Sequence, residues 1–447
     1  MKIYNTLSKK IEELSPIKSK EIKLFVCGIT TQDSVHIGHA KTYCQFDFIV
    51  KYLRHKGYNV FYLQNITDID DRVIQRAKEQ KTNFRKISDK YEQEYLDGMA
   101  ALKVDSVTKY ARATDFIPQI VKQVKALIQK GYAYKIDDGY YFDLSKFNDY
   151  GKLSGRTTLG EEDSVTRIDE SVNKKNRGDF CLWKFSKKDE PSWKTDIGNG
   201  RPGWHIEDTA ITETFFGPQY DLHGGARDLI FPHHEAEIAQ MESSSGKKPL
   251  VRYWMHTGFL NVKGKKMSKS LKNFITVKDV LKKHDYKLIR FFFLTNHYRM
   301  PIDFNDEILE QSKGALDRLN DFALNAKGKK DKVDKKTIEK ARKDFYDNLD
   351  NDFDTPKAFA ALFDFVREAN KIGAGDNSYK LLEEINSVFD FLTLKQDIPE
   401  DIQKLAQKRQ QARENKDFKL SDKLRQEILK KGYQIDDTQD EYKIKKI

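Results

Sequence analysis

The chain has 447 residues, of which 33% are charged, and its 80 Lys and Arg against 69 Asp and Glu give a net charge of +11. The length allows two to four domains, and the basic balance favours a polyanionic partner such as nucleic acid. No apolar run approaches the ~20 residues of a membrane span, and three cysteines without paired spacing argue against a disulfide framework. We therefore expect a cytoplasmic protein with no membrane association.

The N-terminal part of the chain predicts a β-α-β unit with a parallel sheet, because two apolar runs flank an amphipathic stretch. The expected elements are a strand over residues 22–27, a helix over 36–56 and a strand over 58–64. A helix that begins directly after a strand and a short turn offers backbone N–H groups and a dipole that favour phosphate. His36 and His39 lie at this start, and Gly38 between them has no Cβ, so a flat ring such as adenine could lie against the backbone there.

A polar run, residues 65–71, follows the second strand. Ligands of open α/β sheets bind at the carboxyl ends of such strands. The alternative interpretation is a polar N-cap cluster for a helix from Arg72, and Asp70 fits that role equally well. Residues 88–130 are expected to be largely helical.

From residue 131 to about 200 the pattern changes, and we interpret this part as an insertion that splits the nucleotide-binding domain. Residues 180–185 again favour a strand, and the main sheet is expected to resume around residues 189–204.

Residues 221–245 hold a second group of chemically active side chains. His233 and Glu237 are four positions apart on a predicted helix from Pro232, so both project from one face, and both suit Zn²⁺. Such a pair alone is usually an ordinary helix pair, and it indicates a metal only if further ligands converge. Downstream, Lys266-Met267-Ser268-Lys269-Ser270 predicts a loop that can bring positive charge to a phosphate. Only helices are expected between this loop and a short segment at the end of the chain.

The remaining chain predicts helices and one short strand. A charged linker covers residues 327–336, Thr355 is the expected N-cap of a helix with Pro356 first, residues 401–431 form two helices, and 442–447 alternate as a strand.

Two stretches, H-I-G-H at residues 36–39 and K-M-S-K-S at 266–270, resemble the signatures of class I aminoacyl-tRNA synthetases. Over nearly its whole length the chain is similar to the cysteinyl-tRNA synthetases. The stretches that carry the resemblance are FVCGIT, HIGHAKTY, NITDIDDR, PGWHIED, HGGARDLIFPHHEAEIAQ and GKKMSKSLKN.

The resemblance implies an α/β fold, with a Rossmann-type parallel-sheet catalytic domain, an insertion, an α-helical domain and a small C-terminal element. The implied division is the first half of the catalytic domain at 1–130, the insertion at 131–200, the second half at 201–250, a KMSKS-loop and stem-contact region at 251–314, a helical tRNA-binding domain at 315–395 and an anticodon-side domain at 396–447.

The resemblance also implies a reaction and a site. The implied enzyme activates L-cysteine with ATP and Mg²⁺ and then loads tRNA(Cys). Because no dimerisation helix stands out in the sequence, we expect a monomer. The implied catalytic residues are His36, His39, Lys266 and Lys269, and the same residues together with Gly38 are implied to bind ATP. The implied substrate-binding residues are Cys27, Thr67, Trp204 and His233. One Zn²⁺ is implied, with Cys27, His233 and Glu237 as ligands.

The fourth zinc ligand of the family is a cysteine, and this chain has Asp208 in its place. Aspartate is an acceptable zinc ligand, although its oxygen lies one bond further from Cβ than a cysteine sulfur does. The total ligand charge is unchanged, so we expect Asp208 to complete the site. Cys44 and Cys181 are assigned no role.

Two other functions agree with parts of the sequence. A ligase with a similar core could join cysteine to a small amine, but the helical and C-terminal segments favour an RNA acceptor. A silent RNA-binding paralogue could have lost its metal, as Asp208 suggests, but the intact HIGH and KMSKS stretches favour an active enzyme.

Overall fold

The computed structural model describes all residues except 157–172, 268–272, 396–397, 438–441 and 447. Within the described residues, no helix is long and apolar enough to cross a membrane.

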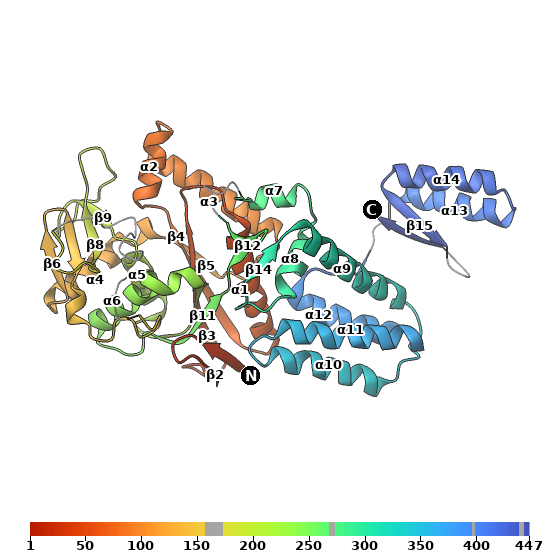
Figure 1. The fold of residues 1–447 in the computed structure, drawn as a ribbon, viewed down its shortest axis with the longest axis horizontal. Helices are drawn as coiled ribbons and strands as arrows, with labels where there is room; N and C mark the ends of the chain where they lie inside the picture. Colours follow the sequence, from red (N-terminus) through yellow and green to blue (C-terminus); the bar gives the residue numbers. More distant parts are fainter. Residues whose placement is uncertain (157–172, 268–272, 396–397, 438–441, 447) are drawn as a thin grey trace.

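A five-stranded parallel sheet in the order β11-β10-β3-β4-β5 forms the centre of the molecule (Figure 1). The sheet confirms the expected α/β class and its β-α-β start. Its elements are β3 (Glu21–Thr30), α1 (Ile37–His55), β4 (Asn59–Thr67), α2 (Asp71–Glu79), α3 (Phe84–Ala101), β5 (Lys109–Arg112), α4 (Ile117–Gln129), α5 (Ile206–Phe216), β10 (Tyr220–Ala226), α6 (Glu235–Ser245) and β11 (Val251–Thr257).

Alternate residues of β3 face two separate cores, as the period of two in a strand requires. Leu24 and Val26 pack into one core with α1 and the helices within residues 286–389. Phe25 and Cys27 pack into the other core with α4, α5 and α6. This alternation turns the Cys27 side chain toward α5 and α6.

Strand β5 was not expected, because residues 88–130 read as helical. The strand has four residues at the edge of the sheet, and Ala111 is its one buried side chain. An edge strand this short carries no alternating apolar pattern, and it interrupts the predicted helix between α3 and α4.

Strands from residues 133–202, most of which fall in the range expected to be an insertion, form a separate four-stranded antiparallel sheet in the order β6-β7-β8-β9. The strand expected at 180–185 is β8. The prediction that the main sheet resumes around 189–204 is wrong, because β9 pairs with β8, and the central sheet continues only at β10. The bounds are β6 (Ala133–Ile136), β7 (Gly139–Phe142), β8 (Phe180–Phe185) and β9 (Gly200–Pro202).

Short elements connect the central sheet to the helices that follow. A three-stranded sheet of the order β13-β12-β14 corrects the expectation of helices only, since β14 follows the KMSKS stretch. A two-stranded hairpin, β1-β2, precedes β3. The bounds are β1 (Lys2–Asn5), β2 (Lys10–Glu13), β12 (Leu260–Val262), β13 (Lys265–Lys266), α7 (Val277–Leu281), α8 (Tyr286–Leu294) and β14 (Ile302–Phe304).

Four helices then pack against α1 and α8 (Figure 1). They are α9 (Asp306–Ala326), α10 (Lys335–Leu349), α11 (Thr355–Ile372) and α12 (Asp376–Phe389). The expected linker lies between α9 and α10. Asp354 rather than Thr355 caps α11, because its carboxylate accepts a hydrogen bond from the Lys357 N–H, so the predicted cap is one residue late.

The last unit has its own small apolar core, formed around Ile402, Ile428 and Ile435. It contains the two helices expected within residues 401–431 and the expected terminal strand, and Figure 1 shows it to one side of the other helices. The bounds are α13 (Glu400–Glu414), α14 (Phe418–Lys430), β15 (Tyr433–Asp437) and β16 (Tyr442–Lys446).

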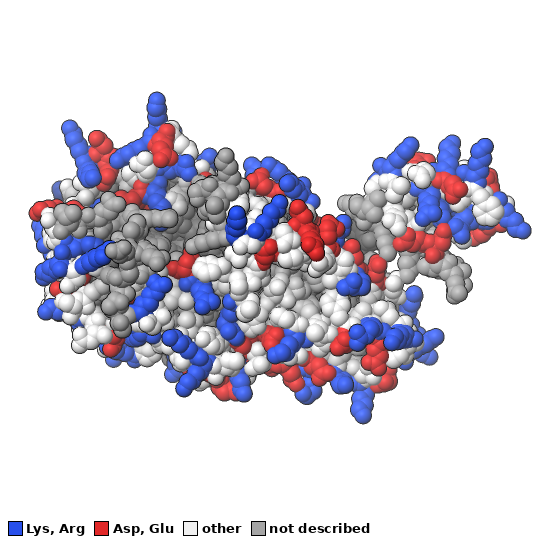
Figure 2. Space-filling model, in the orientation of Figure 1, with Lys and Arg blue, Asp and Glu red and all other residues white. Residues whose placement is uncertain are grey.

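Lys and Arg side chains are spread over the main body and the C-terminal unit, with Asp and Glu between them (Figure 2). The excess of positive charge therefore does not gather into one patch on the face shown.

Candidate active site

The carboxyl ends of β3, β4 and β10 meet the first turns of α5 and α6, and polar side chains from all five elements converge there. Cys27 lies near the end of β3, Asp208 in the first turn of α5, and Glu237 in the first turn of α6. His233 comes from the short π-helical segment, residues 230–234, that leads into α6. All four are buried.

The Cys27 sulfur lies at the centre of this cluster. Its Sγ is 3.5 Å from Asp208 Oδ2 and 3.9 Å from Glu237 Oε1. His233 Nε2 is 3.0 Å from Asp208 Oδ2 and 3.1 Å from Glu237 Oε1. The structure thus brings together the four residues predicted as metal ligands, each with one donor atom within 4.8 Å of the others.

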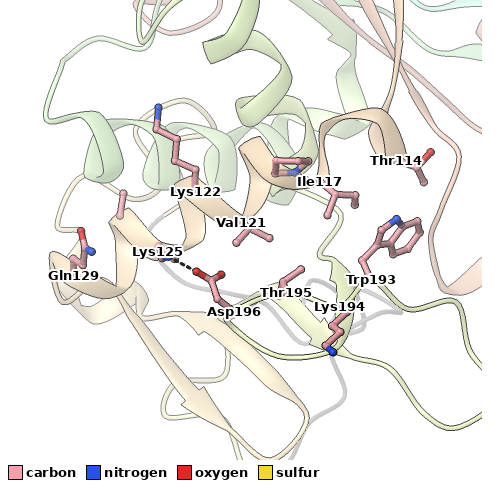
Figure 3. Close-up of a pocket in the computed structure, with 12 residues that line it drawn as sticks. Thr114, Ile117, Val121, Lys122, Lys125, Gln129, Trp193, Lys194, Thr195 and Asp196 are labelled. Atoms are coloured by element: carbon pink, nitrogen blue, oxygen red, sulfur yellow. Dashed lines mark hydrogen bonds and ion pairs between the residues drawn. The ribbon is translucent and has the colours of Figure 1, made fainter.

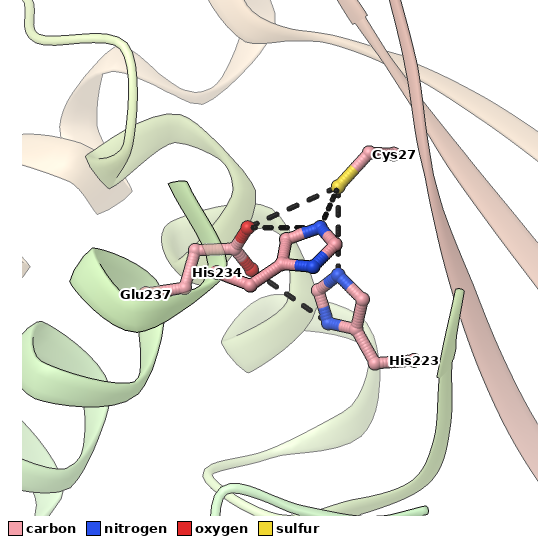
Figure 4. Close-up of side chains that lie close together, drawn as sticks. All are labelled: Cys27, His223, His234 and Glu237. Carbon is pink, nitrogen blue, oxygen red and sulfur yellow. Dashed lines mark hydrogen bonds and ion pairs between the residues drawn. The ribbon is translucent and has the colours of Figure 1, made fainter. Parts of the chain in front are cut away.

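A second set of four shares Cys27 and Glu237 with the first and adds two histidines that the sequence analysis missed (Figure 4). His223 Nε2 lies 3.4 Å and His234 Nε2 3.1 Å from the Cys27 sulfur. A signal for His234 was present, since it lies three residues before Glu237 on the same helical face. His223 could be found only from the pairing of β10 with β3, which no local pattern reveals.

Each of these histidines uses its remaining ring nitrogen for a buried partner. His233 Nδ1 lies 2.8 Å from His205 Nδ1, His223 Nδ1 lies 2.7 Å from the Tyr220 hydroxyl, and His234 Nδ1 lies 2.8 Å from His256 Nε2. Burial lowers the pKa of His223 and His234 well below the usual value. The neutral imidazole that results is the form that binds metals.

The electrostatics of the cluster favour a cation. Burial raises the pKa of the Cys27 thiol well above its ordinary value, and the carboxylates of Glu237 and Asp208 raise it further. Burial and then Asp208 likewise raise the pKa of Glu237. A divalent cation among these groups would reverse both effects, because a coordinating thiol is deprotonated outright.

The donor atoms fit zinc in number, chemistry and spacing. A tetrahedral Zn²⁺ with ligand bonds of about 2.0–2.3 Å holds its donor atoms about 3.3–3.8 Å apart. The separations around Cys27 and His233, from 3.0 to 3.9 Å, bracket that range.

The two predicted substrate residues outside the metal set lie beside it. The Trp204 ring stacks on His233, with centroids 4.4 Å apart and planes 25° apart. Thr67 ends β4, is buried, and donates its hydroxyl hydrogen to Glu207.

The start of α1 differs in one respect from the sequence-based expectation. His36 is the N-cap, and its Nδ1 accepts hydrogen bonds from the Gly38 N–H (3.1 Å) and the His39 N–H (3.3 Å). These amides are therefore occupied by the imidazole and are not open to phosphate. The two imidazoles stack with centroids 3.7 Å apart, and burial lowers the pKa of His36 to about 4.

The segments that carry the HIGH and KMSKS stretches lie side by side. The Ile37 N–H donates to the Ile275 carbonyl at 3.1 Å, and the Val277 N–H donates to the Val35 carbonyl at 3.0 Å. Lys269 and the Lys266 side chain, both predicted to be catalytic, lie outside the part of the chain that the structure describes.

A pocket of about 830 Å³ lies elsewhere, between α4 and residues 193–196, with Trp193 at one end and the Lys125–Asp196 ion pair in its wall (Figure 3). None of the predicted site residues lines it.

Two family models match the chain. Residues 13–314 match the model of the class I (C) tRNA synthetase catalytic domain, and residues 344–395 match the DALR domain.

Similar proteins cover nearly the whole chain. The cysteine–tRNA ligase of Thermoplasma volcanium is 45% identical, covering 98% of each chain, and that of Thermoplasma acidophilum is 45% identical, covering 99% of each. The cysteine–tRNA ligase of Thermococcus onnurineus is 40% identical over 98% of this chain and 97% of its own.

Solved structures show the same fold at low identity. Methionyl-tRNA synthetase of Mycobacterium tuberculosis with methionyl-adenylate has a TM-score of 0.63 at 16% identity, covering 82% of this chain and 89% of its own. A putative arginyl-tRNA synthetase of Campylobacter jejuni has a TM-score of 0.58 at 13% identity, covering 85% and 95%.

Proposed function

The chain belongs to the cysteine–tRNA ligases, a family of class I aminoacyl-tRNA synthetases, and we propose that it selects cysteine with one Zn²⁺ held by Cys27, Asp208, His233 and Glu237. The enzyme joins L-cysteine to tRNA in two steps. The cysteine carboxylate attacks the α-phosphorus of ATP and releases pyrophosphate, and the terminal ribose hydroxyl of tRNA(Cys) then displaces AMP from cysteinyl-adenylate.

The observation that carries the zinc proposal is the convergence of four buried donors, in which a single His233 nitrogen faces both Asp208 and Glu237. This geometry favours the set with Asp208 over the set with His223 and His234. In the latter, His223 Nε2 faces Cys27, whereas its Nδ1 lies 2.7 Å from the Tyr220 hydroxyl and 3.7 Å from Glu237 Oε2.

Zinc in this position would supply a bond to the substrate thiolate. A serine hydroxyl would form no equivalent bond, because it stays protonated near neutral pH. The protein's own contribution is to hold the four donors in a buried site and to exclude water. A pocket without such a bond separates near-isosteres only by about 10²-fold.

On the ATP side, we propose that His36, Gly38 and His39 contact the nucleotide and that Lys266 and Lys269 stabilise the charge on departing pyrophosphate. The Nε2 atom of the neutral His36 ring can make this contact, because only Nδ1 is used in the helix cap. Mg²⁺ would accompany the ATP. The transfer needs positioning and electrostatics rather than a protein nucleophile.

We assign tRNA binding to the helical residues 315–395 and to the C-terminal unit at 396–447, with the protein acting as a cytoplasmic monomer. The DALR match at 344–395 supports the first assignment.

Substitution of Asp208 tests the metal proposal. Asp208→Ala should lower the zinc content and relax the preference for cysteine over serine in ATP–pyrophosphate exchange, whereas Asp208→Cys should keep the metal. Glu213→Gln is the matched control, because this α5 carboxylate pairs with Gln123 outside the cluster. An Asp208→Ala protein with full zinc and unchanged selectivity would refute the role of Asp208.

A further inference from the structure

Glu207 is a buried carboxylate next to the metal set that the proposed mechanism does not use. It precedes Asp208 in the first turn of α5 and is 1% exposed. Its Oε1 accepts a hydrogen bond from the Thr67 hydroxyl. Its Oε2 is buried and has no hydrogen-bond partner among the described residues. Buried carboxylate oxygens are nearly always paired, so this oxygen calls for an explanation.

Among the described residues, the charged groups with the largest effect on Glu207 are other carboxylates. They belong to Asp208, Asp68 and Asp70. Asp68 already has a cation, since Arg85 Nη1 lies 2.8 Å from its Oδ2. A buried carboxylate among carboxylates is costly unless a cation joins it.

A short chain of contacts connects Glu207 to the metal set. Asp208 Oδ1 accepts a hydrogen bond from Asn65 Nδ2 at 2.5 Å, and the same amide lies 3.3 Å from the Thr67 hydroxyl that reaches Glu207. The Cys27 sulfur lies 3.5 Å from Asp208 Oδ2, the carboxylate at the other end of this chain of contacts. In a cysteine molecule, three covalent bonds separate the sulfur from the amino nitrogen. A substrate with its sulfur at the metal set can therefore place its ammonium group on the side of the site where Glu207 lies.

We propose that Glu207 Oε2 accepts a hydrogen bond from the α-ammonium group of the substrate. Glu207 would thus select thiols that carry an α-amino group over those that lack one. Thr67 fixes the carboxylate through its other oxygen. Since Oε2 is covered in this structure, neighbouring side chains must shift by the size of an ammonium group, and the resulting contact is shielded from water. This inference rests on the established ligation of cysteine and extends it to the recognition of the amino group.

The proposed contact also sets the direction of the substrate. With sulfur at the metal and the ammonium at Glu207, the α-carboxylate is repelled by the acidic residues and must point away from them. The carboxylate is the group that attacks ATP, so Glu207 would hold it in position for the reaction.

The experiment compares L-cysteine with 3-mercaptopropionate, which keeps the thiol and the carboxylate but lacks the amino group. Binding of each is measured by calorimetry on the zinc-loaded full chain, for the wild type, Glu207→Gln and the control Glu213→Gln. Glu207→Gln should weaken cysteine about 10- to 100-fold, as expected for a hydrogen bond to a charged group, and change 3-mercaptopropionate less than about threefold. Zinc content should be the same in all three proteins.

Loss of zinc from Glu207→Gln, or equal weakening of both ligands, would overturn the proposal and leave Glu207 a structural residue. If this variant does not fold, the wild type decides alone, because equal affinity for the two ligands would overturn the proposal as well. A wild type without cysteine-dependent ATP–pyrophosphate exchange would instead contradict the ligase function.

Discussion

The start of α1 leaves no room for a side chain at Gly38. A Cβ atom there would lie 2.9 Å from Cε1 and Nδ1 of the His36 ring and 3.5 Å from Cε of Met267. The glycine therefore lets the capping imidazole and the KMSKS segment approach the same backbone. This close approach explains why a residue without Cβ is needed between the two histidines.

Gly38→Ala should displace the His36 ring and slow ATP–pyrophosphate exchange by about 10- to 100-fold, because small misplacements of a catalytic group are costly. Gly314→Ala is the matched control, since a Cβ at this position in α9 meets no atom within 4 Å. The control should keep full activity and gain about 0.5–1 kcal/mol in the free energy of unfolding. Exchange at the wild-type rate in Gly38→Ala would contradict the ATP-side assignment.

The candidate site divides into residues that a sequence reveals and residues that only the fold brings in. Cys27, His233 and Glu237 were found because the family resemblance assigns them as zinc ligands, and because the spacing of His233 and Glu237 puts both on one helix face. Glu207 and His223 lie in the same matching stretches but were given no role, because their contacts with Thr67 and Cys27 join separate elements of the fold. Spacing within one element can be read locally, whereas contacts between elements require the tertiary structure.

At the scale of elements, the long periodic segments and the strands at 180–185 and 442–446 were predicted, whereas the shortest strands of the sheets were not. The helix at 36–56 and the strands at 22–27 and 58–64 bury wide apolar surfaces, so their pattern is strong. Strands β5 and β9 have four and three residues and depend on their neighbours in the sheet. Their position is set by pairing, which a local pattern cannot specify.

Helix α12 illustrates a stabilising contact from outside the element. Its N-cap, Gly375, has no side chain to cap the helix. Asp331, from the loop before α10, accepts hydrogen bonds from the N–H groups of Gly375 (2.7 Å), Asn377 (2.6 Å) and Ser378 (3.1 Å).

Asp331→Ala should therefore lower the free energy of unfolding by about 2 kcal/mol, the upper end of the range for a helix cap. Adenylate formation per folded molecule should stay unchanged. In Asp364→Ala, which breaks an exposed ion pair with Arg367, the loss should be at most about 0.5 kcal/mol. Urea denaturation measures the free energy of unfolding of both variants. Equal losses in the two would show that Asp331 stabilises the protein no more than an exposed ion pair does.

At the scale of the whole molecule, the catalytic sheet and the helices from α8 to α12 share one apolar core. Phe48 of α1 stacks on Phe389 of α12 with centroids 4.5 Å apart, and buried Arg290 of α8 pairs with Asp47 of α1 at 2.9 Å. The boundary proposed at residue 314 lies inside α9, so a cut there would open this core. The C-terminal unit has a separate core and is the better segment to remove.

A chain that ends at Lys395 should fold and keep its rate of cysteine-dependent ATP–pyrophosphate exchange within about twofold. Its kcat/KM for charging tRNA(Cys) should fall about tenfold or more, because phosphate contacts of the C-terminal unit are lost. The full-length protein, assayed at the same salt concentration, is the control. Equal charging by both chains would refute a tRNA-binding role for residues 396–447.

The central claim is that one metal ion at Cys27, Asp208, His233 and Glu237 receives the thiolate of the substrate. The most direct measurement is the absorption spectrum of the full-length protein after Zn²⁺ has been replaced by Co²⁺, recorded with L-cysteine and with L-serine. The account predicts one equivalent of metal per chain and a stronger thiolate-to-cobalt charge-transfer band with cysteine but not with serine. A protein that binds no metal, yet still activates cysteine in strong preference to serine, would contradict it.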